Sequence, residues 1–129
     1  MGSVVSPYSL GGLALQATTG PAGYTLVNGT GNILTWTPPN DGQLHRVVVI
    51  SSLHVTTTEV GGAIRLTYTT PDGTGAGSLS IYGGNTVGPG IAIGANNSPI
   101  VQANATVALT QTSALTSGAA VLWAELWGS

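Results

Sequence analysis

The sequence predicts an all-β protein, a single antiparallel sandwich, jelly roll or barrel of about eight to ten short strands. Three observations support this fold class. Apolar and polar residues alternate with a period of two along most of the chain, as they do on half-buried strands. Turn-forming residues interrupt these runs every eight to twelve positions or so. No stretch shows the periodicity of an amphipathic helix.

The composition is that of a folded chain with one domain. Val, Leu and Ile contribute 32 of the 129 residues and the net charge is only -2, so the chain has more apolar content than chains that fail to collapse. A chain of this length usually forms one domain. Pro7 disfavours a central strand near the start. We therefore expect an extended N-terminal arm over residues 1–12 and one β domain over residues 13–129.

The first half of the domain contains five predicted strands. Short apolar runs separated by Gly-Pro and Asn-Gly turns cover residues 13–17, 24–27 and 33–36. The run over 44–58 is the longest and is rich in β-branched residues, which favour strands. The last of the five alternates cleanly over 63–70.

The long run over 44–58 is predicted to be a central strand. Its odd-numbered residues, beginning at His45, form one face, and its even-numbered residues, beginning at Arg46, form the other. Both faces are partly apolar, as expected of a strand that contacts the core and also a neighbouring surface. The Glu-Val-Gly-Gly sequence at 59–62 can form a turn, so we expect this strand and the next to form a hairpin.

Turn signals and short strands also alternate through the second half. The Thr-Pro-Asp-Gly-Thr sequence at 70–74 favours a turn because Pro presets φ, Asp bonds nearby backbone and Gly accepts a positive φ. Alternating runs follow at residues 78–82, 91–93, 104–112 and 119–127. On the last run, one face carries Val121, Trp123, Glu125 and Trp127.

The charge content excludes several classes of function. The chain has two Arg, no Lys and no Cys. Two cations cannot neutralise the roughly six to ten phosphates of a typical nucleic-acid interface, and they form no polybasic membrane patch. No apolar run approaches the ~18 residues of a membrane-spanning helix. We expect no nucleic-acid partner, no membrane partner and no cysteine-ligated metal.

Groups for catalysis or metal binding are scarce. Asp41, Glu59 and Asp72 fall in predicted turns, where we expect them to be solvated. His45 and His54 are an odd number of positions apart on one strand, so they face opposite sides and cannot share a metal ion. A ring of one His from each subunit of a trimer is the alternative. Because no nucleophile elbow is present either, we expect no enzyme, no cofactor and no metal.

The aromatic residues and Glu125 have two interpretations. Trp36, Trp123 and Trp127 either fill the core and a subunit interface or form a platform for sugars. Glu125 shares its predicted face with the last two tryptophans. It lies either on an exposed face or in an interface, where it would pair with Arg46 or Arg65 of a neighbour.

One succession of residues resembles a known family. Residues 33–49 read as an aromatic-Thr-Pro sequence and an acidic-Gly turn followed by a β-branched strand, and related strands follow at 53–56, 64–73, 105–107 and 121–126. This succession resembles the small jelly-roll virion proteins of tailed bacteriophages. Many of these are homotrimers with a tumour-necrosis-factor-like topology. They serve as capsid decoration (head cement) proteins or as head- and tail-fibre domains.

The resemblance implies a non-enzymatic virion protein with a jelly-roll fold. It would be made in the host cytoplasm and bind the major capsid protein lattice on the outer surface of the capsid as a homotrimer, stabilising the shell. The alternative is a head- or tail-fibre knob that binds host cell-surface glycan. In the first case an extended arm can add a strand to an exposed edge. The expected capsid contacts are Val4, Val5, Pro7 and Tyr8, and the expected subunit interface contains Arg46, Arg65, Trp123, Glu125 and Trp127.

Overall fold

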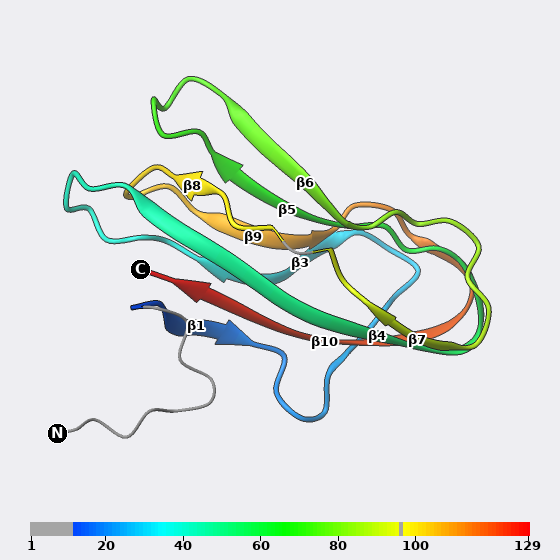
Figure 1. Ribbon diagram of the computed structural model, residues 1–129. Coiled ribbons are helices and arrows are strands. Elements are labelled where there is room, and N and C mark those ends of the chain that lie inside the picture. The colour runs from blue at the N-terminus through cyan, green and yellow to red at the C-terminus, as the bar shows by residue number, and fades with distance from the viewer. Residues whose placement is uncertain (1–11, 96) are drawn as a thin grey trace, which may run out of the picture.

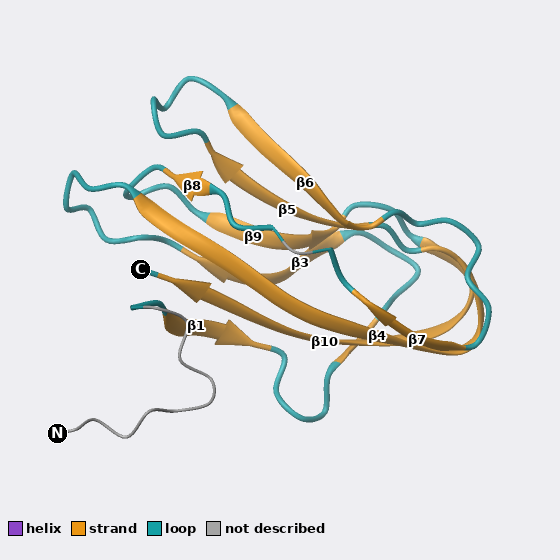
Figure 2. Ribbon diagram, viewed as in Figure 1, coloured by secondary structure: helices purple, strands orange, loops and turns teal. Residues whose placement is uncertain are grey.

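The computed structural model describes residues 12–95 and 97–129, which contain ten strands and no helix (Figures 1 and 2). This confirms the all-β prediction and the expected number of strands. The strands are β1 (Ala14–Thr18), β2 (Tyr24–Thr25), β3 (Gly31–Trp36), β4 (His45–Gly61), β5 (Ile64–Thr69), β6 (Ala76–Tyr82), β7 (Gly90–Ile93), β8 (Ile100–Val101), β9 (Val107–Gln111) and β10 (Leu115–Gly128).

The strands form two antiparallel sheets that pack face to face. The six-stranded sheet has the order β1-β10-β4-β7, with β2 also paired to β10 and β8 to β4, and the four-stranded sheet has the order β3-β9-β5-β6. The pairs β1/β10, β3/β9, β4/β7 and β5/β6 are nested, as in one long hairpin rolled into two layers. This is the arrangement of a jelly roll, with eight principal strands in two sheets.

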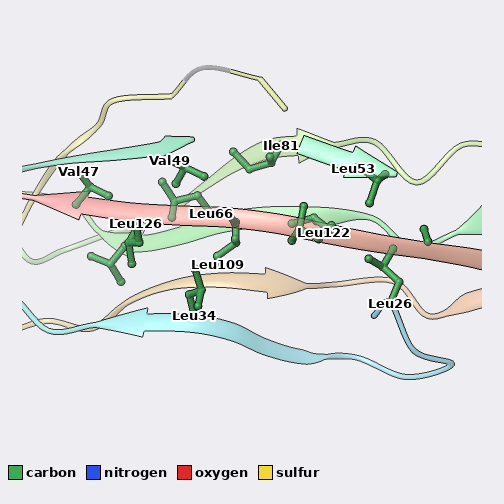
Figure 3. Close-up of a cluster of buried hydrophobic side chains, with 14 of the residues drawn as sticks. Leu26, Leu34, Val47, Val49, Leu53, Leu66, Ile81, Leu109, Leu122 and Leu126 are labelled. Carbon is green, nitrogen blue, oxygen red and sulfur yellow. The ribbon is translucent and has the colours of Figure 1, made fainter. Parts of the chain in front are cut away.

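The core lies between the sheets and follows the predicted alternation. On β4 the odd-numbered residues up to Val55 are buried, and on β10 the even-numbered residues from Ala120 onward are buried. Leu66 and Leu109, which pair across β5 and β9, enter the same space from the other sheet (Figure 3). Burial of each such leucine stabilises the fold by about 1.5–3 kcal/mol.

The predicted hairpin between residues 44–58 and 63–70 is wrong. The first run becomes β4 and the second β5, and these strands lie in different sheets. Gly61 and Gly62 have φ values of 91° and 76°, which favour glycine, and they turn the chain from one layer to the other. A Cβ on Gly62 would lie 2.8 Å from Leu26 Cδ2, so the corner is also tightly packed.

The hairpin of this region is formed one turn later, by β5 and β6. Thr69 pairs with Ala76 across it. Asp72 organises the predicted turn, since its Oδ1 accepts hydrogen bonds from Thr70 Oγ1 at 2.7 Å and from the Thr74 backbone N–H at 3.1 Å. These bonds hold the pKa of Asp72 below its usual value.

The predicted N-terminal arm falls almost wholly outside the described residues. Its expected capsid contacts, Val4, Val5, Pro7 and Tyr8, all lie there. The described chain begins at Gly12 and enters β1, at one edge of the six-stranded sheet.

Candidate interaction surface

The outer face of the six-stranded sheet is unusually apolar. It is formed by residues of β1, β10, β4 and β7 that point away from the core. Directly opposed residues of antiparallel strands share a face, and the register therefore gathers four large side chains here. They are between 42% and 75% exposed and are Leu15, Ile50, Ile91 and Ile93. A contiguous exposed apolar surface of this kind is typical of a protein contact site.

A groove of about 550 Å³ crosses this face. Its floor is formed by Trp123 and Glu125 of β10 and by the neighbouring residues of β4, beginning at Ile50. Leu15 and the loop at 18–21 form one side, and Ile93 of β7 lies on the other side. We refer to this feature as the sheet groove. Its volume is in the usual range for binding pockets, about 300–1,000 Å³.

The loop beside the groove is held by hydrogen bonds to β10. The Thr19 N–H donates to Ala124 O at 3.1 Å, and Thr19 Oγ1 accepts from the Ala124 N–H at 3.0 Å. The Trp123 indole N–H donates to Pro21 O at 2.9 Å. The tryptophan ring is therefore fixed before anything binds, which reduces the entropy cost of binding.

Glu125 is half-buried in the groove and, among the described residues, is the only charged one that lines it. Its Oε1 accepts a hydrogen bond from the Trp127 indole N–H at 3.2 Å. Trp127 is itself buried on this side of the sheet. The predicted interface pair of Glu125 with an arginine therefore needs a cation from outside the groove.

The structure separates the five residues that sequence reasoning placed in one interface. Four of them, Arg46, Trp123, Glu125 and Trp127, lie on the outer face of the six-stranded sheet. Arg65 lies on β5 of the other sheet, where its Nε and Nη2 donate to Ser78 Oγ at 2.6 Å and Ser78 O at 3.0 Å. Sequence periodicity assigns a face within one strand, but it does not say which sheet the strand joins.

Arg46 lies at one end of the same outer face, beside two exposed apolar residues. Ile100 of β8 pairs with Arg46 in the register and is 37% exposed, and Leu44 just precedes β4 and is 63% exposed. We call Leu44, Arg46 and Ile100 the Arg46 corner. Within the described residues, the Arg46 guanidinium makes no hydrogen bond or ion pair. Sequence reasoning missed both apolar neighbours, because alternation alone does not reveal exposure.

His45 is buried below this corner, on the core side of β4. Its Nε2 lies 2.9 Å from Asp41 Oδ1 and its Nδ1 lies 2.8 Å from Ser129 O, and the Trp36 ring packs edge-on at 6.1 Å. Both nitrogens face acceptors, so the imidazolium satisfies both bonds. The Asp41 contact, followed by the Ser129 carbonyl, raises the pKa of His45. The Gln43 backbone N–H, followed by His45, lowers the pKa of Asp41.

The two histidines lie on opposite faces, as the odd spacing predicts. His45 is buried and His54 is half-exposed on the outer face. Within residues 12–95 and 97–129, no group of three or more His, Cys, Asp or Glu side chains could hold a metal ion. In the same part of the chain, no helix has the length and apolarity needed to cross a bilayer.

Glu59 corrects a second prediction, that of a solvated turn carboxylate. The residue is only 2% exposed, because β4 continues to Gly61 and position 59 keeps the odd-numbered, inward direction of the strand. Its backbone bonds to Val87 in both directions. Its Oε2 has no hydrogen-bond partner among the described residues, and burial raises the pKa of the carboxyl group.

No family model matches the sequence, and no curated protein matches it. Among solved structures, a chain in "Structure of infectious bursal disease virus Gx strain" is similar with a TM-score of 0.45 and 11% sequence identity. The match covers 90% of this chain and 30% of that one. The chain thus spans less than a third of the viral chain that it matches, and the likeness is a distant one.

Proposed function

We propose that this protein is a non-enzymatic structural component of a bacteriophage virion. It is a capsid decoration (head cement) protein that binds the outer surface of the major capsid protein lattice as a homotrimer. The observation that carries this proposal is the apolar outer face of the six-stranded sheet, with the sheet groove and the Arg46 corner on it. The jelly-roll strand order and the succession of strands and turns that resembles phage decoration proteins support it further.

Stabilisation of the shell follows from mass action. A protein that binds the assembled lattice and not the separated subunits shifts the equilibrium toward the assembled shell. In this proposal the arm residues Val4, Val5, Pro7 and Tyr8 add a strand to an exposed edge of the capsid protein. The jelly-roll domain then remains on the outer surface of the capsid as a rigid body.

Binding to purified capsids tests the proposal. Expanded capsids that lack the protein are incubated with increasing amounts of it and imaged. We expect saturable density at local threefold positions and a higher capsid melting temperature. A variant lacking residues 1–8 should bind more weakly, whereas Asp72→Asn, which alters an exposed turn on another surface, should bind normally. Unchanged affinity without residues 1–8 would discard the arm, and no capsid binding by the full chain would discard the decoration role.

A fibre knob that binds host cell-surface glycan is the second candidate. The observation that favours it is Trp123, whose ring is held in the sheet groove by its bond to Pro21 and could stack on a sugar. Retention on a host-glycan array, abolished by Trp123→Ala and combined with absence of capsid binding, would replace the decoration role with this one.

A further inference from the structure

We propose that the Arg46 corner of one copy enters the sheet groove of a neighbouring copy. In this contact the Arg46 guanidinium pairs with the Glu125 carboxylate, and Leu44 and Ile100 cover the apolar side chains of the groove. The inference rests on the proposed function in one respect, since it identifies the contact that would join the subunits of the homotrimer.

The first argument is charge complementarity. Within the part of the chain that the structure describes, Glu125 is the one charged residue that lines the groove, and the chain contains only two lysine or arginine residues in all. Arg65 lies on the other sheet and is bonded to Ser78. Arg46 is therefore the cation that a second copy can offer to this carboxylate from the same outer face.

The second argument is that Arg46 and Glu125 form no ion pair with each other within one copy, among the residues that the structure describes. Glu125 is opposite Ile50 in the register of β10 and β4, and Arg46 lies four residues away along β4. At a rise of about 3.3 Å per residue the two positions are separated by about 13 Å along the strand. A contact between two copies brings the two groups together without spanning this distance.

The third argument is the match between the apolar parts of the two patches. Leu44 and Ile100 flank the arginine at the corner, while Ile50, Ile93 and Leu15 line the groove. Contact would remove these exposed side chains from water, which is the main favourable term in association. An arginine over a tryptophan also gains a cation–π interaction, and Trp123 is present at the groove floor.

The contact joins two different patches, so it forms either reciprocally across a twofold axis or head-to-tail between successive copies. Head-to-tail contacts close into a ring when the rotation between neighbours allows it, and three copies would form one such ring. A twofold pair would instead form the contact twice and give a dimer. The mass of the particle distinguishes these two arrangements.

A charge swap tests the contact in solution, without capsids. Sedimentation equilibrium is measured for the wild type, Arg46→Glu, Glu125→Arg and the double variant. We expect each single variant to raise the dissociation constant at least about tenfold, since each places like charges together in a desolvated groove. The double variant should recover most of the affinity, because it restores the pair with reversed sign.

Two further variants are controls for the charge swap. Arg65→Glu makes the same change of charge on the opposite sheet and should leave self-association unchanged. Glu125→Gln keeps an acceptor for the Trp127 indole, so loss of association in this variant reflects loss of charge and not a disturbed β10. Circular dichroism should confirm that every variant is folded.

The results separate this inference from the proposed function. The contact is overturned if the wild type assembles but the double variant dissociates as much as the single variants do. It is also overturned if Arg65→Glu loses as much self-association as Arg46→Glu. A wild type that is monomeric at tens of micromolar overturns both the contact and the homotrimer. Capsid binding by such a monomer would leave the decoration role standing.

Discussion

At the scale of single residues, Glu59 is a buried carboxyl group whose Oε2 has no hydrogen-bond partner among the residues that the structure describes. Its raised pKa means that the folded state favours the protonated form. The stability that the folded state gains from holding Glu59 protonated is fully present below the ordinary pKa of 4.5. It is lost as the pH rises through the raised pKa that Glu59 has in the folded protein. Burial of an unpartnered polar atom is costly in either form, and far more so when it is charged.

We predict that Glu59→Gln stabilises the protein at about pH 8 by about 1 kcal/mol and has little effect at about pH 4. The amide has the same shape and cannot ionise. Urea unfolding at both pH values measures the change. Asp72→Asn is the control, and it should destabilise slightly instead, because a neutral amide oxygen accepts the bonds from Thr70 and Thr74 more weakly than the carboxylate does. A Glu59→Gln variant less stable than the wild type at the higher pH would contradict the prediction.

The Asp41–His45 pair predicts a second pH dependence. The contribution of Asp41, whose pKa is lowered from 3.8, is present above that value and lost as the pH falls. The contribution of His45, whose pKa is raised from 6.5, is present below that value and lost as the pH rises. The pair is therefore most stabilising between these two pH limits.

Asp41→Asn should accordingly destabilise the protein more at about pH 5.5 than at about pH 9. The asparagine Oδ1 still accepts from the Gln43 N–H, so the turn is preserved. Chemical unfolding at both pH values provides the comparison, and the titration of His45 followed by NMR should shift to lower pH in the variant. An equal loss of stability at the two pH values would show that the ion pair contributes nothing.

At the scale of elements, alternation predicted most strands and failed at the corners. It divided β4 correctly into an odd-numbered and an even-numbered face without saying which one is buried, and it placed β10 from residue 119, whereas the strand begins at Leu115. It missed β8, since two residues cannot establish a period. It also joined β4 to β5 in a hairpin, because a Gly-Gly turn within a sheet and a Gly-Gly corner between sheets have the same local sequence.

Close packing across the β5–β6 hairpin predicts the effect of a small substitution. Gly77 lies opposite Tyr68 in the register, and a Cβ at position 77 would collide with the tyrosine ring. We expect Gly77→Ala to destabilise the protein by about 1–3 kcal/mol. Gly88→Ala is the matched control: a Cβ there meets no atom within 4 Å. It should be neutral or stabilise by up to about 1 kcal/mol. Similar urea midpoints for the two variants would contradict this packing.

At the scale of the whole molecule, local sequence contains little information about strand order. β1 pairs with β10 and β3 with β9 across most of the chain length, and no turn signal connects such distant segments. Residue pattern alone therefore left sandwich, jelly roll and barrel open, and the resemblance to phage virion proteins was needed to favour the jelly roll. The candidate interaction surface was predictable only in part, because Arg46 and Arg65 look alike until their sheets are known.

The low charge of the whole chain predicts how its assemblies respond to salt. Six charged side chains in 129 residues leave association to shape and apolar contact, with little long-range attraction to be screened. The proposed Arg46–Glu125 contact adds one pair that is shielded from solvent, where screening is weak. We therefore expect the affinity for capsids to change less than about threefold between about 50 and 500 mM NaCl.

Binding isotherms on expanded capsids across this range of salt measure the effect. Self-association of the wild type, followed by sedimentation in the same buffers, should be equally insensitive, because its apolar contacts do not weaken with salt. A loss of capsid affinity of about tenfold or more would require many exposed ion pairs. This chain has six charged side chains in all, too few to form them. Such a loss would therefore contradict the inference that shape and apolar contact, rather than charge, hold the protein on the shell.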